Sequence, residues 1–139
     1  MNYYLDAFRP YFNFEGRARR KAYWMFFLFN MIAVFITTLL DNTLGMTFDG
    51  EDVMGRGYIY LLYMLFTFVP NLGMTLRRLH DVGKPGAFIL IGLIPLVGAF
   101  WLLVLFCTDS QYGENAYGPN PKGKGNSNED EISEIGKSL

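Results

Sequence analysis

Cysteine and histidine are almost absent from this sequence of 139 residues, which contains only Cys107 and His80. A single cysteine cannot form an intramolecular disulfide or a cysteine-rich metal site. His80 is followed by Asp81, but one imidazole and one carboxylate are too few for a zinc site, which needs three or four ligands. No Ser or Cys nucleophile stands at a catalytic motif spacing from His80. We therefore expect no metal, no other cofactor, no catalytic residue and no enzymatic activity.

A large excess of charge of one sign is also lacking. Twelve Lys or Arg and 13 Asp or Glu give a formal net charge of −1. Nucleic-acid-binding domains have a strongly basic surface, so we expect no nucleic-acid partner. The first residues are aromatic rather than basic, and no small-residue cleavage site follows the first apolar block. A secretory signal peptide is therefore not expected.

Apolar residues, in contrast, make up 51% of the chain and are concentrated in three uncharged blocks. Each block is close to the roughly 20 residues that a helix needs to cross ~30 Å of hydrocarbon. The blocks are residues 22–40, 58–76 and 87–107. They predict an all-α integral membrane protein, a small bundle of three transmembrane helices kinked at Pro70 and Pro95. For the third block a hairpin is the alternative, and it would add a fourth pass.

The two ends of the chain differ from the apolar blocks. Six aromatic residues fall within the first fourteen positions, and aromatic rings with polar tips favour the headgroup level of a membrane. Residues 1–15 are therefore predicted to form an interfacial arm, and an arm that packs back on the bundle is the alternative. Residues 16–121 form the predicted membrane domain. Residues 122–139 have few apolar groups and are predicted to be a flexible tail.

The distribution of Lys and Arg predicts the topology. The N-terminal segment has five, the loop at 77–86 three, the loop at 41–57 one and the segment after the last block three. Cytoplasmic loops carry an excess of Lys and Arg, so we expect a multi-pass protein of the bacterial inner membrane with a cytoplasmic N-terminus. With three spans the tail lies outside; a hairpin at 87–107 returns it to the cytoplasm.

Four short motifs follow one another along the chain, and each combines charged, aromatic or turn-forming residues at fixed spacing. They are Phe14-x-Gly16-Arg17-x-x-Arg20-x-x-Tyr23-Trp24, Arg77-Arg78-Leu79-His80-Asp81-x-Gly83-Lys84, Ile94-Pro95-x-x-Gly98, and Cys107 followed by Asn115-x-Tyr117-Gly118-Pro119-x-Pro121. In this order they resemble the bacterial inner-membrane family called domain of unknown function 805. The resemblance covers roughly residues 10–121, and it implies a small inner-membrane protein without an established reaction.

The first two motifs bring basic residues to the predicted cytoplasmic face. We expect the first helix to start near Gly16. We expect the second helix to continue to about His80, with Gly83 as its stop. The start of the first helix and the end of the second then lie at the same face. We expect the basic residues to cluster there with two carboxylates as internal partners. One interpretation is orientation signals with interfacial ion pairs; the other is a binding site for the phosphate of an anionic lipid. The predicted site contains Arg17, Arg20, Arg77, Arg78 and His80, with Glu15 and Asp81 as the ion-pair partners.

Two amides lie within the predicted spans. Asn30 and Asn71 are each about 9–12 Å from the basic end of their helix at 1.5 Å per residue. One hypothesis is that they line a small intramembrane polar pocket; the other is that Asn30 packs the helices through a hydrogen bond.

Two functions remain after these exclusions. The first is a non-enzymatic module that binds anionic lipid or a membrane-protein partner through its basic face. The second is a transporter or channel component, which would be a homo-oligomer because three short spans enclose little space. The spans contain no paired acid or Lys of the kind that transport pathways use, and this absence ranks the first function above the second.

Overall fold

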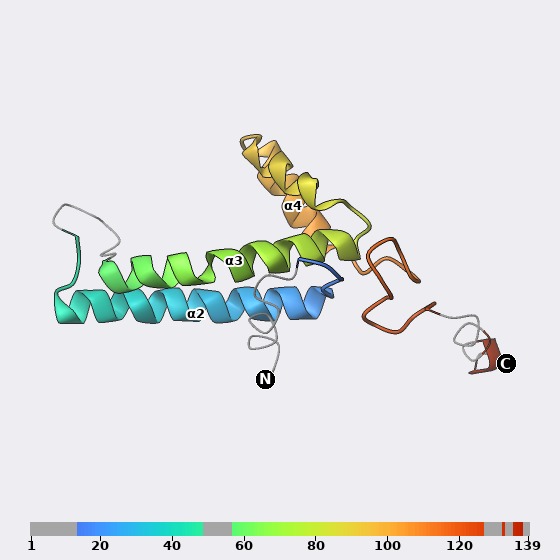
Figure 1. Cartoon of the computed structure of the whole chain (residues 1–139), viewed down its shortest axis with the longest axis horizontal. Helices are drawn as coiled ribbons and strands as arrows, with labels where there is room; N and C mark the ends of the chain where they lie inside the picture. Colours follow the sequence, from blue (N-terminus) through green and yellow to red (C-terminus); the bar gives the residue numbers. More distant parts are fainter. Residues whose placement is uncertain (1–13, 49–56, 127–131, 133–134, 138–139) are drawn as a thin grey trace.

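The computed structural model describes residues 14–48, 57–126, 132 and 135–137, and it is built from helices (Figure 1). Most of the predicted interfacial arm lies outside these residues. Within them there is no strand, and only two isolated bridges occur. The helices are α2 (Arg20–Leu44), α3 (Tyr58–Asp81), the 3-10 helix η1 (Gly86–Leu93) and α4 (Val97–Cys107).

Helices α2 and α3 form a long antiparallel pair (Figure 1). Their 25 and 24 residues correspond to about 37 and 36 Å, enough to cross a bilayer. Their apolar side chains point outward: Phe35 is 69% and Leu62 67% exposed. A core helix of a soluble protein would bury such side chains, so their exposure suits a lipid environment. The helices predicted over 22–40 and 58–76 are confirmed, each a few residues longer.

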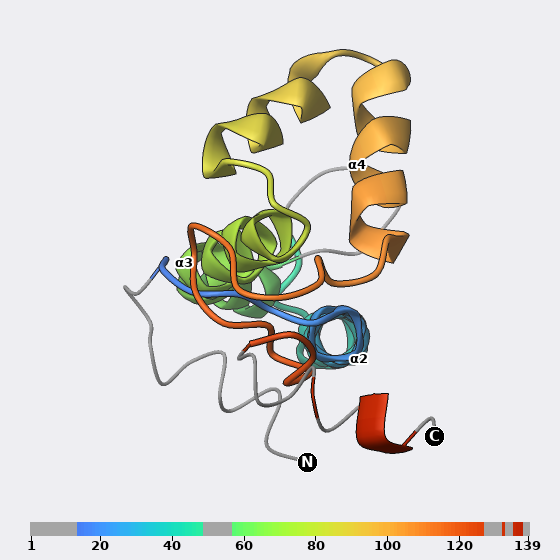
Figure 2. The same cartoon turned by 90° about the vertical axis from the view of Figure 1, so that its right-hand side faces the viewer.

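The third predicted span is not one kinked helix. Residues 86–93 and 97–107 form two separate short helices in contact with each other, and the chain reverses between them (Figure 2). Pro95 disfavours helix at the residue before it, and Ile94 is extended with ψ 115°. Leu96 then takes a φ of +62°. The hairpin alternative is therefore the arrangement that the structure has, and the prediction of a single third span is wrong.

The close approach of the two hairpin arms depends on Gly98. A Cβ at this position would lie 1.8 Å from the carbonyl oxygen of Ile91, so any other residue would push the arms apart. Eight residues of 3-10 helix and eleven of α-helix each span about 16 Å. This is about half the thickness of the hydrocarbon core.

Both ends of the hairpin lie at the end of the helix pair where α2 begins and α3 ends. Arg20 Nη1 donates to the carbonyl oxygen of Cys107 at 3.2 Å. The backbone N–H of Gln111 donates to the backbone carbonyl of Asp81 at 2.9 Å. The residues after α4 consequently lie at the same end as the start of α2. This is the end at which the hairpin alternative places the tail, whereas three spans would have placed it at the opposite end.

Helix α3 ends as the sequence predicts but begins with an unexpected cap. It ends at Asp81, and Gly83 follows with a φ of +73°, which confirms Gly83 as the stop signal. The helix continues through Pro70, and the kink predicted there stays a prediction.

At the start of α3 the cap comes from a different helix. Gly57 precedes α3 and offers no capping side chain. Asp41 of α2 accepts hydrogen bonds from the amides of Ile59 at 3.0 Å and Tyr60 at 2.8 Å. These are the amides that an N-cap side chain normally satisfies, and a carboxylate is favoured at this end of a helix. The fully buried Asp41 therefore joins the two long helices at the end opposite the hairpin.

We predict that Asp41→Ala destabilises the protein by about 1–2 kcal/mol, the cost of a lost N-cap, because two amides of α3 lose their acceptor. The measurement is thermal unfolding of the purified protein in detergent. Thr43→Ala is the control, since the exposed Thr43 hydroxyl bonds only within α2, to Leu40. Equal unfolding temperatures of the two variants would contradict the role of Asp41.

Candidate functional site

The predicted basic cluster is built around one buried carboxylate, that of Asp81 at the end of α3. Oδ1 accepts a hydrogen bond from Arg17 Nε at 3.1 Å, and Oδ2 accepts one from Ser110 Oγ at 2.6 Å. Arg78 Nη1 also donates to Oδ2. The carboxylate and both arginine side chains are at most 1% exposed. Asp81 thus holds together the segment before α2, the end of α3 and the segment after α4.

The remaining N–H groups of Arg17 donate to the Asp81 carbonyl and to backbone carbonyls after α4. Nη1 donates to the Gly113 oxygen at 2.7 Å, and Nη2 donates to the Gln111 oxygen at 2.6 Å. Charge-assisted hydrogen bonds of this kind are about twice as strong as neutral ones. Arg17 therefore fixes the chain that leaves the hairpin against the chain that enters α2.

Arg78 has an equivalent role on the other side of Asp81. Its Nη1 donates to the Ala18 oxygen and its Nε to the Phe106 oxygen, both at 3.3 Å, and its Nη2 donates to the Thr108 oxygen. Anion binding by Arg17 and Arg78 stays a prediction, but in this structure their donors bond to the protein itself.

Arg20 and Arg77, the other predicted arginines, lie nearer the surface. Arg20 is exposed and bonds the last carbonyl of α4. Arg77 is half-buried, and its Nε donates to the Gly73 oxygen at 3.3 Å. Lys84, in the turn before η1, has its Nζ 5.4 Å from the centre of the Phe88 ring. The basic residues therefore divide into a buried pair and an outer group.

His80 is held by a stacked aromatic ring and lies near a backbone carbonyl. Its ring lies parallel to the Tyr117 ring at 4.0 Å between centroids, and its Nδ1 is 3.3 Å from the Gly16 oxygen. The two rings, with Glu15 and Ala116, line an open cavity of about 360 Å³. Sequence reasoning missed Tyr117 and Ser110 as partners, although Tyr117 belongs to the fourth motif.

The segment after α4 is folded onto this end of the molecule. Asn115 Nδ2 donates to the His80 carbonyl at 2.9 Å, and Asn120 Nδ2 donates to the Gln111 carbonyl at 3.1 Å. Lys122 donates to the exposed Asp109 carboxylate, and this hydrogen bond lowers the pKa of Asp109. The segment is therefore a folded cover over the ion network.

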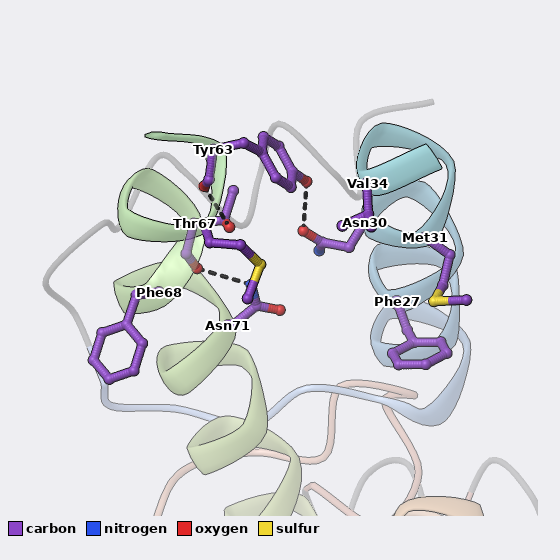
Figure 3. Close-up of a pocket in the computed structure, with 9 residues that line it drawn as sticks. Phe27, Asn30, Met31, Val34, Tyr63, Thr67, Phe68 and Asn71 are labelled. Carbon is purple, nitrogen blue, oxygen red and sulfur yellow. Dashed lines mark hydrogen bonds between the residues drawn. The ribbon is translucent and has the colours of Figure 1, made fainter. Parts of the chain in front are cut away.

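The two intramembrane amides lie in one groove between α2 and α3 (Figure 3). Asn30 Oδ1 accepts a hydrogen bond from Tyr63 Oη at 2.7 Å, which links the helices, and Asn71 Nδ2 donates to the Thr67 carbonyl at 2.9 Å. The groove has a volume of about 260 Å³ and an apolar rim that includes Phe68. Asn30 is ten residues from Arg20 and Asn71 is six residues from Arg77, which correspond to about 15 and 9 Å along the helices. Features of both hypotheses therefore occur together: a helix-linking bond and a partly polar groove.

We predict that Asp81→Asn destabilises the protein by about 3–5 kcal/mol, because two buried guanidinium groups lose the carboxylate to which both are bonded. The measurement is again thermal unfolding in detergent. The matched control is Asp109→Asn, since Asp109 is an exposed carboxylate with one lysine partner at the same end. If both variants unfold at the wild-type temperature, the network does not stabilise the fold.

Comparison with known proteins agrees with the resemblance seen in the motifs. The family model described as "Protein of unknown function (DUF805)" matches residues 11–119. Inner membrane protein YhaI of Escherichia coli strain K12 is 42% identical over 122 residues, which are 88% of this chain and 97% of that protein. Inner membrane protein YhaH of the same strain is 40% identical over 122 residues, 88% of this chain and 98% of that protein. No solved structure matches. The chain therefore belongs to the DUF805 family, a family of unknown function whose relatives YhaI and YhaH are inner membrane proteins.

Proposed function

We propose that the chain is a non-enzymatic inner-membrane module that binds anionic lipid at its basic end, beside an apolar hairpin that enters the membrane from that side. One observation carries this proposal: a cation flanks each end of the hairpin. Lys84 precedes η1 and lies over Phe88, and the exposed Arg20 bonds the carbonyl of Cys107 at the end of α4.

The hairpin has the dimensions of a segment that enters one leaflet and returns. Its arms are about 16 Å long, and its tip is apolar and exposed, with Leu96 87% and Leu93 79% accessible. Irregular backbone at membrane depth requires protein or water around it. In the hairpin such backbone is confined to the short turn between η1 and α4. A lipid whose acyl chains lie along the hairpin would have its phosphate level with Arg20, Lys21 and Lys84.

The two ends of the α2–α3 pair differ in charge, and this difference supports a cytoplasmic location for the basic end. Residues 14–22 and 77–126 contain nine Lys or Arg and four Asp or Glu. The loop at 41–57 contains four Asp or Glu and one Arg. Cytoplasmic segments are enriched in Lys and Arg, and the inner leaflet attracts basic segments with about 1 kcal/mol per residue. In the proposed topology α2 and α3 cross the membrane, and the N-terminus, hairpin base and tail are cytoplasmic.

A transporter or channel component is the second candidate, and the groove between α2 and α3 favours it. Across the described part of the two spans, however, the only charged side chain between Lys21 and Arg77 is Asp41, and it caps α3. Proton and ion pathways use ionisable groups within the membrane. The lipid-binding module therefore remains the first candidate.

The proposed topology predicts the outcome of reporter fusions. Green fluorescent protein fused after Lys124 should fluoresce, and alkaline phosphatase fused at the same point should be inactive. Fusions within the loop at 41–57 should give the opposite pattern. Active phosphatase after Lys124 would mean that the hairpin segment crosses the membrane, and it would overturn the proposed topology.

Lipid binding is tested with the outer cations, because replacing Arg17 or Arg78 would disturb the fold. We expect the triple variant Arg20→Gln, Lys21→Gln and Lys84→Gln to retain at least tenfold less phosphatidylglycerol, since each juxtamembrane cation contributes about 1 kcal/mol. The measurement is native mass spectrometry from nanodiscs that contain phosphatidylglycerol and phosphatidylcholine.

The control for this experiment is Lys124→Gln, an exposed cation in the segment after α4, and it should retain lipid as the wild type does. Elution of each variant as a single species in size-exclusion chromatography checks folding. Unchanged retention of phosphatidylglycerol by a folded triple variant would refute the site.

A further inference from the structure

We propose that the groove between α2 and α3 is a second lipid site, separate from the basic end, and that it binds an uncharged lipid with a free hydroxyl group. The two amides of the groove lie about 9 Å from Arg77 on α3 and about 15 Å from Arg20 on α2, a depth within the hydrocarbon region of a bilayer. Charged headgroups do not reach this depth. A ligand there must be apolar, with at most a small polar group.

The polar groups of the groove define what that small group must be. Both polar atoms of the Asn30 side chain have hydrogen-bond partners. Oδ1 accepts from Tyr63 Oη, and Nδ2 donates to the Phe26 carbonyl at 3.0 Å. The Thr67 hydroxyl donates to the Tyr63 carbonyl at 2.8 Å. Donors in the groove are therefore already directed at protein acceptors.

Asn71 is different, because only half of its amide is used. Nδ2 donates to the Thr67 carbonyl at 2.9 Å, whereas Oδ1 receives no hydrogen bond from the part of the chain that the structure describes. The Asn71 side chain points into the space between the helices (Figure 3). An unsatisfied carbonyl oxygen in hydrocarbon is costly, and a hydroxyl group supplies the donor that it lacks.

The walls of the groove suit an apolar chain. Its rim is formed by exposed side chains of both helices, among them Phe27, Met31 and Phe68. Methionine side chains are flexible and adapt to irregular ligands. The volume of about 260 Å³ accommodates a hydroxyl group with the adjoining part of a lipid, and the groove opens to the side where the remaining chain would lie in the bilayer. Diacylglycerols and polyprenols both have this chemistry.

The test compares ligands that differ only in the hydroxyl group. Full-length protein in phosphatidylcholine nanodiscs is titrated with dioleoylglycerol or with its acetate ester, and bound lipid is counted by native mass spectrometry. A polyprenol and its acetate form a second arm, which distinguishes the two classes of lipid. We expect each alcohol that fits to be retained about three- to tenfold more than its acetate, as one hydrogen bond allows.

Two variants locate the site. Asn71→Leu removes the acceptor at similar volume and should abolish the preference for the alcohol over its acetate. Val34→Phe fills the groove and should reduce retention of both forms. Asn42→Leu is the matched control, because it makes the same change near the far end of α2, where Asn42 Nδ2 bonds Thr38. It should retain the wild-type preference.

Three results would overturn the proposal. The first is equal retention of alcohol and acetate by the wild type in both arms. The second is labelling of Asn71→Cys, in a Cys107→Ser background, by a water-soluble maleimide, which would show an aqueous groove. The third is loss of a dimer in Asn71→Leu, which would show that a second copy occupies the groove. The basic-end variants should leave this preference unchanged, so failure of one lipid site does not imply failure of the other.

Discussion

The fold depends on one buried carboxylate, that of Asp81, between two buried guanidinium groups. Taking three charges out of water costs several kcal/mol per ion unless partners satisfy them. Here the two arginines donate to backbone carbonyls just before α2, at the end of α4 and in the segment after it. The same contacts that satisfy the charges therefore also determine where these segments lie.

This constraint explains why the third apolar block turns back. The hairpin begins a few residues after Asp81, and the residues that follow α4 supply carbonyls and the Ser110 hydroxyl to the Asp81 network. Its two ends are thus held close together, which is incompatible with a helix that crosses a bilayer. Pro95 and Gly98 make the reversal possible, since they interrupt the helix and allow the arms to approach.

The long helices and the end of α3 were predictable because hydrophobic length and a helix-stopping glycine are local signals. The choice between a kinked span and a hairpin was not, because Pro and Gly in an apolar block permit both and only the later residues decide. Asp41 was predicted as part of a polar loop, yet it caps α3. The missing cap at Gly57 was the available signal, but its replacement comes from a different helix.

The basic motifs show a second limit of sequence reasoning. A run of arginines has the same appearance whether its side chains bind a ligand or hold the chain together. All four of the basic residues at this joint belong to the family motifs. Arg17 and Arg78 are buried and bond to Asp81 and to backbone carbonyls. Arg20 and Lys84 lie at the hairpin ends, where Arg20 bonds the Cys107 carbonyl and Lys84 lies over Phe88. The motif residues of this chain therefore stabilise the contact between its segments as well as contributing to its surface.

Two buried carboxylates, Asp81 and Asp41, make contacts at the two ends of the helix pair. Asp81 joins the helices to other segments at one end, and Asp41 joins α2 to α3 at the other. Between these two ends, the Tyr63 hydroxyl of α3 donates a hydrogen bond to Asn30 Oδ1 of α2. The Asn30 Nδ2 group donates within its own helix, to the Phe26 carbonyl. Helices in lipid gain little from hydrophobic packing against each other, so the hydrogen bond from Tyr63 contributes to the contact between α2 and α3 at the level of the groove. The groove is lined by residues of α2 and α3 and by none of the described residues that bond Asp81, so a ligand there would leave the joint that holds the fold intact.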